Sequence, residues 1–419
     1  MKLAFVTPRY GAEITTGPEH ACRLFAERLA RRHDVDVLTT CAHDARTWRN
    51  ALTEGADRVR GVMVRRFTVS PPVAPGEPDA TPIGREAELA WLRRRGPWSP
   101  GLNEYLSGQT RGYDAVVYFS LLQPATAHAY SVAPDRTVVF PYLVPDRRLR
   151  FGLWREILDT VRGVGYFSEA ERRLARTYIG AEPRTDDTVG IGVADSTPLT
   201  YPRHQQDPSD DADADEAFGG SDDEVPAEYL AGRGIPFRRQ HRLYGPLAAY
   251  AGRVEQDNGF EELFEYFDAY AASGGEAALA LFGPKLMRVP DAPFARLAGV
   301  VPDRQRMTVF EGADVMLAPA HDDLLSLPLL ESLAIGTPVL ASARNLAAVA
   351  HCRASNGGLY YADADEFAEA LKLLMSDSAL RAGLGENGRE YVRQHCGWDA
   401  ALARFEQLVG GAPRNRGHH

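Results

Sequence analysis

The residues best suited to chemistry in this sequence are two carboxylates, Asp323 and Glu331, in a stretch that reads as loop, helix, turn and strand. Pro328 suits the first turn of a helix, and Gly336 ends it. A loop that opens a helix presents free backbone N–H groups and the positive end of the helix dipole, which bind anions. With the carboxylate of Glu331 turned to the same place, the stretch suits the phosphates and ribose diol of a nucleoside diphosphate. A buried strand-loop-helix unit with Glu331 in solvent fits the pattern equally well.

The elements around this stretch are those of a parallel α/β sheet, because short apolar runs alternate with amphipathic stretches. Gly11 and Gly17 lie in the loop after the first strand, where ligands of such sheets bind and where glycine lets a ligand approach the backbone. An ordinary connecting loop is the alternative, although this loop exceeds the usual length of about two to six residues. The first expected elements are the strand 2–7, the loop 8–19, the helix 20–32 and the strand 35–40.

The stretch around Glu331 resembles a motif of the retaining GT-B glycosyltransferases of family 4. These enzymes carry Glu-x(7)-Glu, often as E-G-F-G-L-P-L-L-E-A followed by G-x-P-V, and this chain has D-L-L-S-L-P-L-L-E-S-L-A-I-G-T-P-V. The second Glu of the motif falls on Glu331, the first falls on Asp323, and Ser326 replaces a glycine. Residues 7–29 resemble the family's opening, P-R-x-G followed by G-G-A-E and L-A-x-x-L. Further stretches resemble a subset that acts on bacterial polysaccharides and glycoconjugates.

The resemblance covers most of the chain and implies the GT-B fold, an α/β architecture of two Rossmann-like domains that face a central cleft. It also implies that the last helix, 398–411, packs back on the first domain. The expected domains are an N-terminal, acceptor-side domain over 1–195, a hinge and an acidic, disordered insertion over 196–242, and a C-terminal nucleotide-sugar domain over 243–397.

The resemblance implies a metal-independent transferase that moves a sugar from a nucleotide sugar to a hydroxyl acceptor in glycan or glycoconjugate synthesis. Its chemistry is stabilisation of the leaving diphosphate plus positioning, without a covalent nucleophile. Three residues are expected to be catalytic: Arg253 at the diphosphate, Glu331 at the ribose and Asp323 at the sugar hydroxyls. The expected donor-binding residues are Gly11, Gly17, Arg253, Asn258, Lys285, Asp323, Ser326, Leu327 and Glu331.

Three positions depart from the family's pattern. Val144 stands where relatives often have a His that helps bind the sugar or the diphosphate, Asn258 replaces a Lys, and Asp323 shortens a Glu. Lys285, after the next strand, is the candidate to supply the missing cation. These departures leave open a non-catalytic subunit that binds a sugar nucleotide or a partner. The Leu-Pro-Leu-Leu-Glu run that ends at Glu331 argues against a sugar-nucleotide epimerase of the same fold.

The composition excludes several classes of protein. The net charge is −10, but residues 207–228 contain ten acids and no bases, so the rest of the chain is near neutral (−10 + 10 = 0). A near-neutral folded part argues against nucleic-acid binding, which needs a basic field. The four cysteines lack disulfide or metal-ligand spacing, which is typical of a cytoplasmic protein. No apolar run is long enough for a membrane span.

The partners follow from these expectations. No cofactor is expected apart from the nucleotide-sugar co-substrate, for which a UDP-sugar is favoured and a GDP-sugar is next. The hydroxyl acceptor is not identified by the sequence. The run Arg93–Arg95 suits an anionic acceptor or peripheral contact with a membrane surface, although a solvated helix end explains it more simply.

Overall fold

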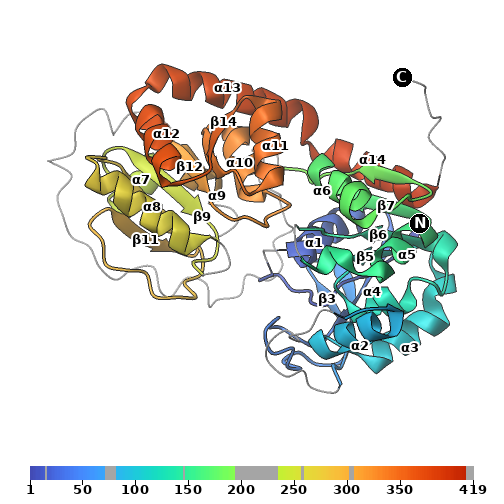
Figure 1. Cartoon of the computed structure of the whole chain (residues 1–419). Helices are drawn as coiled ribbons and strands as arrows, with labels where there is room; N and C mark the ends of the chain where they lie inside the picture. Colours follow the sequence, from blue (N-terminus) through green and yellow to red (C-terminus); the bar gives the residue numbers. More distant parts are fainter. Residues whose placement is uncertain are drawn as a thin grey trace, which may run out of the picture. The chain divides into compact units, whose positions relative to one another are not determined.

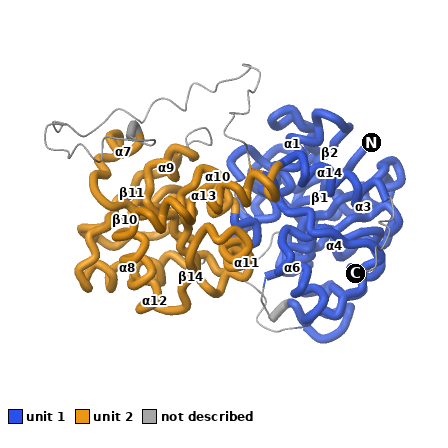
Figure 2. Tube along the Cα trace, turned by 90° about the horizontal axis from the view of Figure 1, so that it is seen from above, with its two compact units in different colours: residues 1–192, 322–326, 398–419 blue, residues 193–321, 327–397 orange. Residues whose placement is uncertain are grey.

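The computed structural model describes residues 1–14, 17–70, 82–144, 147–193, 235–255, 259–301 and 306–411 (Figure 1). Most of the expected insertion, including its acidic part, and Asn258 lie outside these described residues. The chain forms two compact units, coloured separately in Figure 2. Unit 1 comprises residues 1–192, 322–326 and 398–419, and unit 2 comprises residues 193–321 and 327–397.

Unit 1 is built on a sheet with the strand order β3-β4-β2-β1-β5-β6-β7-β8. Neighbouring strands are parallel, except in the β3–β4 hairpin. Strands β5, β6 and β7 are buried along their whole length, as parallel strands covered on both faces must be. The strands are β1 (Lys2–Val6), β2 (Asp34–Thr40), β3 (Gly55–Val59), β4 (Val62–Phe67), β5 (Ala115–Phe119), β6 (Thr137–Phe140), β7 (Gly163–Tyr166) and β8 (Asp186–Thr188).

The helices of unit 1 cover its sheet (Figure 1). One apolar core joins sheet residues such as Val116 and Tyr166 to Trp91 and Trp154 on the helices. Short 3₁₀ or π turns complete the connections (Thr110–Gly112, Pro134–Arg136, Arg147–Arg150 and Ala175–Ile179). The helices are α1 (Gly17–Leu29), α2 (Arg85–Arg95), α3 (Pro100–Gln109), α4 (Pro124–Ala129), α5 (Gly152–Thr160), α6 (Glu169–Leu174) and α14 (Trp398–Gly410).

Helix α1 corrects one expectation, because it covers Gly17–Leu29 and not 20–32. Pro18 occupies the second helical position, where its fixed φ is already helical and its missing N–H is not needed. Glu19 adds a negative charge to the first turn, which the helix dipole favours. The loop after β1 is therefore shorter than expected, and Gly17 begins the helix.

Helix α14 closes one face of the unit 1 sheet with aromatic side chains. The ring of Phe405 stacks on the rings of Phe25 and Phe140, with distances between ring centres of 5.1 Å and 5.7 Å. At the start of the helix, the Arg28 guanidinium lies 3.7 Å from the centre of the Trp398 ring. Aromatic clusters of this kind contribute strongly to burial, so the last helix is part of the core of unit 1.

Unit 2 has a parallel sheet in the order β11-β10-β9-β12-β13-β14. Its strands are β9 (Leu247–Ala251), β10 (Ala278–Phe282), β11 (Ala295–Gly299), β12 (Val315–Ala318), β13 (Val339–Ser342) and β14 (Gly358–Tyr361). Its helices are α7 (Ile235–His241), α8 (Phe260–Ala272), α9 (Arg306–Gly312), α10 (Leu327–Ile335), α11 (Leu346–Ser355), α12 (Ala364–Ser376) and α13 (Ser378–His395). Both units thus have the Rossmann-like architecture expected from the sequence.

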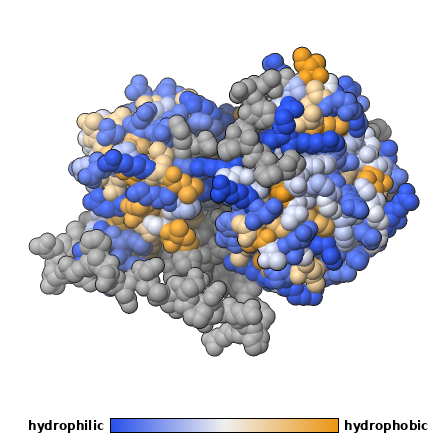
Figure 3. Space-filling view, turned by 90° about the horizontal axis from the view of Figure 1, so that it is seen from below, coloured by the Kyte–Doolittle hydropathy of each residue, from blue (hydrophilic) through white to orange (hydrophobic). Residues whose placement is uncertain are grey.

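The surface in Figure 3 is mostly hydrophilic, with hydrophobic residues in small groups. The most exposed large apolar side chains are scattered in the sequence, with Ile83 at 94 % and Val300 at 71 % exposure. Singly exposed apolar residues are normal on a folded protein. The sites of interest are therefore sought at the strand ends and in cavities.

Replacing Phe405 by Ala is expected to lower the free energy of unfolding of unit 1 by about 3–5 kcal/mol, because the ring is fully buried. Tyr178, which is 68 % exposed, provides the matched aromatic control, and Tyr178→Ala is expected to change stability by under about 0.5 kcal/mol. Urea unfolding followed by circular dichroism measures both. Equal effects of the two substitutions would show that α14 is not part of the core.

Candidate functional site

The strand order of unit 2 places β9 and β12 next to each other in the middle of the sheet. From β9 the chain crosses to β10 on one side, and from β12 it crosses to β13 on the other. Ligands of doubly wound sheets bind outside the carboxyl ends of the strands at such a reversal. Gly259, before α8, has a φ of 70°, and a Cβ there would lie 2.7 Å from the carbonyl oxygen of Pro319 after β12. The connections that follow β9 and β12 therefore meet at this reversal.

Two glycines bring the ends of β9 and β10 into close contact. The N–H of Gly252 donates to the carbonyl oxygen of Phe282 at 2.8 Å. A Cβ on Gly283 would lie only 2.1 Å from the carbonyl oxygen of Gly252. Beyond the glycines, Val254 pairs with Lys285 in a parallel bridge. Arg253 and Lys285 are thereby held on adjacent connections at the carboxyl edge, where two cations suit a diphosphate.

Arg253 is oriented by its own neighbours. The hydroxyl of Tyr250 donates to the carbonyl oxygen of Arg253 at 2.7 Å, which fixes the backbone. A guanidinium nitrogen lies 2.6 Å from a carboxylate oxygen of Glu255, a side chain only 6 % exposed, whereas that of Arg253 is 38 % exposed. A guanidinium carries five N–H donors in a planar fork, a geometry that suits anions such as a diphosphate. The buried Glu255 therefore orients the exposed end of Arg253.

Helix α10 carries Glu331, half-buried in its second turn. The helix is anchored by Leu329, Leu330 and Leu333, which are at most 1 % exposed. At its carboxyl end, the Ser332 hydroxyl donates to the Thr337 carbonyl oxygen at 2.9 Å. This anchoring fixes the direction in which the first turn of α10, beginning at Leu327, presents its N–H groups.

The loop 322–326 before α10 is grouped with unit 1. In it, the N–H of Ser326 donates to Asp323 Oδ1 at 3.1 Å, and the Ser326 hydroxyl donates to the Asp323 carbonyl oxygen at 3.0 Å. Ser326 has a φ of 44°, in the left-handed region that favours glycine. That conformation explains the glycine that family 4 relatives carry here, and Asp323 supports it by accepting the Ser326 N–H.

Sequence reasoning missed several polar residues at the ends of β12 and β13. Glu262, in the first turn of α8, lies 3.3 Å from His321 and 2.8 Å from Arg344. Asn345 donates to the carbonyl oxygen of Ala320 at 2.7 Å and caps α11 by accepting the N–H of Ala348. The position of His321 and Arg344 shortly after apolar strands was the signal that could have identified them.

In unit 1, the loop after β1 contains Gly11 and leads to Gly17. A Cβ on Gly11 would lie 2.1 Å from the carboxylate of Glu13, a flexible side chain that can move. Gly17 has a φ of 71° at the start of α1, where a larger residue would be strained. Arg9 and Glu19 form an ion pair at 3.0 Å across the loop. Only at Gly17 does the backbone itself require glycine.

The loop after β6 contains Val144, which is half-buried and offers no hydrogen bond where relatives often have His. Its shape depends on Glu171 of α6, whose carboxylate accepts the N–H groups of Leu143 at 3.0 Å and Phe167 at 2.7 Å. Glu171 is fully buried, which raises the pKa of its carboxyl to about 7, while the backbone donors act in the opposite direction. This carboxyl therefore titrates near neutral pH.

Two further observations concern the part of the chain that the structure describes. It contains no group of three or more His, Cys, Asp or Glu residues that is arranged to hold a metal ion. None of its helices combines the length and the apolar character that are required to cross a bilayer.

A family model described as glycosyl transferases group 1 matches residues 236–391, which include Arg253, Lys285 and Glu331. These residues belong to that family. The resemblance recognised in the sequence is thereby confirmed. D-inositol 3-phosphate glycosyltransferases are similar at 28 % identity: the alignments cover 26 % of the Corynebacterium aurimucosum protein and 48 % of the Xylanimonas cellulosilytica protein. The chain thus spans half or less of the length of these curated relatives.

Solved structures extend the similarity of fold to nearly the whole chain. Sucrose-phosphate synthase from Thermosynechococcus elongatus superposes with a TM-score of 0.66 at 17 % identity, over 98 % of both chains. HepE from Anabaena, solved with UDP-glucose, gives a TM-score of 0.67 at 13 % identity, over 98 % of this chain and 100 % of that one. WaaG superposes with a TM-score of 0.60 at 16 % identity, over 98 % of this chain and 100 % of that one. The GT-B fold expected from the sequence is confirmed.

Ser326 is expected to tolerate Gly best and Val worst, because a β-branched residue is strained at positive φ. Ser326→Ala loses the hydroxyl bond to Asp323 but adds no branch, so it is the matched control. We expect Ser326→Val to be less stable than Ser326→Ala by about 1–3 kcal/mol. Thermal unfolding measures the difference, and equal stability of the two variants would contradict the strained loop.

The titration of Glu171 predicts a pH dependence of stability. Its folded pKa, about 7, lies above the ordinary value of 4.5, so the folded state binds more protons between these values. Stability is then expected to fall as pH rises from about 4.5 to 7. The Glu171→Gln variant should lack this part of the slope. Melting temperatures of both proteins between pH 4.5 and 8 measure it, and identical slopes would refute the assignment.

Proposed function

We propose that this chain is a retaining, metal-independent glycosyltransferase that moves a sugar from a nucleotide sugar to a hydroxyl acceptor. The observation that carries the proposal is the carboxyl edge of unit 2. There, Arg253 and Lys285 follow adjacent strands, and Glu331 follows the strand on the other side of the reversal. Cations for a diphosphate and a carboxylate for a ribose diol are the groups that a nucleotide-sugar site requires.

Each residue has a chemical role in this proposal. Arg253, oriented by Glu255, stabilises the negative charge that develops on the leaving diphosphate, and Lys285 supplies a second cation. The N–H groups of the first turn of α10, from Leu327 onward, bind a phosphate, and Glu331 binds the ribose hydroxyls. Asp323, in the loop before α10, accepts the N–H of Ser326 and binds hydroxyls of the transferred sugar. Catalysis comes from stabilising the negative charge on the leaving diphosphate and from positioning the substrates.

The donor and acceptor are proposed from the relatives' printed names. HepE is described in complex with UDP and glucose and with UDP-glucose, so a UDP-sugar is our first choice of donor. The curated relatives are named D-inositol 3-phosphate glycosyltransferases. WaaG is described as a glycosyltransferase involved in lipopolysaccharide biosynthesis. We place the acceptor on unit 1, in the synthesis of a glycan or glycoconjugate.

Two observations favour a second candidate, a sugar-nucleotide-binding subunit without transferase activity. Val144 provides no polar group in the loop where relatives often have His. The ion pair with Glu255 also reduces the net charge that Arg253 offers to a diphosphate. Such a subunit would bind a nucleotide sugar at the carboxyl edge of unit 2 but would not catalyse transfer of its sugar.

The deciding experiment is calorimetric titration with UDP-, GDP-, dTDP- and ADP-sugars. One nucleotide is expected to bind in the micromolar range. Arg253→Ala and Glu331→Ala are each expected to weaken it about tenfold or more, since a hydrogen bond to a charged group contributes about 1.5–3 kcal/mol. Arg296→Ala and Glu369→Ala, at exposed positions of the same unit, are the matched controls and should bind like wild type.

The outcomes separate the two candidates. Binding of one nucleotide together with slow hydrolysis of its sugar supports the transferase. Binding with no hydrolysis, and no transfer to a panel of hydroxyl acceptors, supports the non-catalytic subunit. Absence of binding across the panel, or equal loss in the control variants, would remove the donor site from unit 2.

A further inference from the structure

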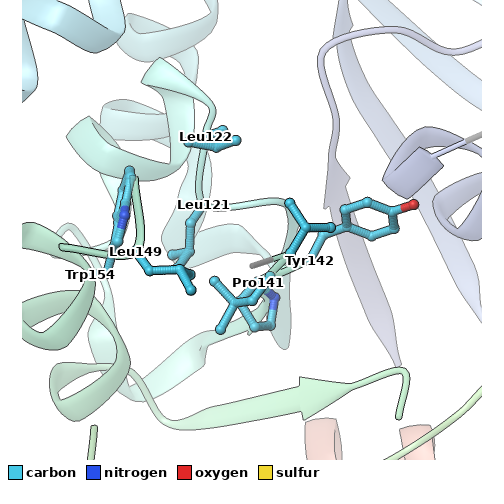
Figure 4. A pocket seen from close by; sticks show the side chains of 8 residues that line it. Leu121, Leu122, Pro141, Tyr142, Leu149 and Trp154 are labelled. Carbon is cyan, nitrogen blue, oxygen red and sulfur yellow. The ribbon is translucent and has the colours of Figure 1, made fainter. Parts of the chain in front are cut away.

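The pocket at the carboxyl ends of β5 and β6 in unit 1 is too small for a ligand larger than water (Figure 4). Its volume of about 20 Å³ leaves room for about one water molecule. In Figure 4, Leu121, Leu149 and Trp154 gather around it, whereas the ring and hydroxyl of Tyr142 extend away from it. The pocket therefore belongs to the packing of unit 1, and the groups that suit a further ligand lie at the carboxyl edge of unit 2.

Arg344 lies at that edge, just after β13, and a carboxylate orients it. Its guanidinium lies 2.8 Å from one carboxylate oxygen of Glu262, and the other oxygen of Glu262 lies 3.3 Å from the ring of His321. The side chain of Arg344 is 55 % exposed, whereas that of Glu262 is 21 % exposed. The pair repeats the arrangement of Arg253 and Glu255, in which a less exposed carboxylate holds a more exposed arginine. Arg344 is therefore a further oriented cation, on the other side of the reversal.

The loop that carries Arg344 is tied to the loop after β12. The side-chain amide of Asn345 donates to the carbonyl oxygen of Ala320 at 2.7 Å. His321 follows Ala320 directly and precedes Asp323 by two positions in the sequence. The proposed function assigns the hydroxyls of the transferred sugar to Asp323. Arg344 is thus held beside the loop that leads to the residue expected at the transferred sugar.

A buried hydroxyl lies close to these charges. Tyr361 ends β14, the strand beside β13, and is 1 % exposed. Within the described part of the chain, its hydroxyl has no hydrogen-bond partner. Burial raises the pKa of Tyr361, and so does the charge of Glu262, whereas the charge of Arg344 acts in the opposite direction. The hydroxyl therefore stays protonated near Glu262 and Arg344. Because a buried donor without a partner is costly, its presence indicates a bound group that accepts from it.

The donors at this place select the chemistry of that group. The planar fork of a guanidinium matches a carboxylate, which it binds through two parallel hydrogen bonds. The hydroxyl of Tyr361 adds a further donor. The carboxylate of Glu262 is already shared by Arg344 and His321, so the group that completes the site must itself be an acceptor. A carboxylate on the ligand meets these requirements better than a hydroxyl.

We propose that Arg344 and Tyr361 bind a carboxylate on the transferred sugar, so that the donor is a nucleotide-linked uronic acid. The inference rests on the proposed function, which places the donor at the carboxyl edge of unit 2, and it narrows the donor to an acidic sugar. Arg344 binds the carboxylate, Tyr361 donates a further hydrogen bond, and Glu262 is a positioning residue that directs the guanidinium. A neutral hexose leaves these donors without an anion and binds more weakly.

Calorimetric titration of the full-length protein with UDP, UDP-glucose and UDP-glucuronate tests the proposal. The two sugars differ only in the carboxylate, which replaces a hydroxymethyl group in UDP-glucuronate. UDP-glucuronate is expected to bind about tenfold more tightly or better, because a hydrogen bond to a charged group is stronger than one to a hydroxyl. Arg344→Gln should remove this preference and leave the affinity for UDP unchanged. Tyr361→Phe, which removes only the hydroxyl, should reduce the preference without altering the binding of UDP.

Arg393→Gln is the matched control and should keep the wild-type preference, because Arg393 is an exposed arginine of unit 2 that pairs with Glu390 within α13. Equal affinity for the two sugar nucleotides, or a preference that survives Arg344→Gln, would overturn the proposal. Loss of the preference in Arg393→Gln as well would assign it to the general charge of unit 2, which also overturns the proposal. Failure of UDP itself to bind refutes the donor site, whereas normal UDP binding without the preference refutes only the carboxylate site.

Discussion

The proposed donor edge of unit 2 depends on the contact between two backbones at which no side chain fits. A Cβ on Gly283 would overlap the carbonyl oxygen of Gly252, so β9 and β10 can end this close together only with glycine at that point. The contact sets the bridge between Val254 and Lys285 and hence the separation of the two cations. A similar contact, of Gly259 with Pro319, ties the connection after β9 to the one after β12. The chemistry of the edge is thus positioned by backbone packing rather than by the charged side chains themselves.

Buried and half-buried carboxylates fulfil a second structural role in both units. Glu255 orients the half-buried Arg253, Glu262 joins two strand ends, and Glu171 and Glu88 accept backbone N–H groups in unit 1. In each case the desolvation of the carboxylate is offset by hydrogen bonds or by a cation. The backbone N–H groups of these loops are consequently hydrogen-bonded within their own unit. At its carboxyl edge, unit 2 presents cations and N–H groups.

The sequence predicted much of this because the decisive features are local. Strands such as β1 and β10 are continuous apolar runs, and the Leu-Pro-Leu-Leu-Glu run before Gly336 has helical spacing, so element type and order followed from pattern. Glu331 and Arg253 were identified by their register with a known motif. The true start of α1 was indicated by Pro18 and Glu19, but that signal was overlooked.

Features that depend on partners distant in the sequence were not predictable. Glu171 contacts a loop that lies between two other elements, and Glu88 contacts the start of α5, some 64 positions away in the chain. No spacing rule reports such pairs. Ser326 is an intermediate case: its replacement of a glycine was visible, but the left-handed backbone that makes the replacement costly appears only in the structure.

The return of α14 to unit 1 has a consequence for how the chain folds during synthesis. Phe405 packs on Phe25 and Phe140, so the first sheet lacks part of its core until the last helix leaves the ribosome. Unit 2, apart from the loop 322–326, is made in one continuous stretch before that point and can fold first. Its folding brings residues 1–192 and α14 closer together, which shortens the effective loop that α14 must close. The nascent protein therefore passes through a stage in which the aromatic face of the first sheet is exposed, and this is the stage at which chaperones would be most needed.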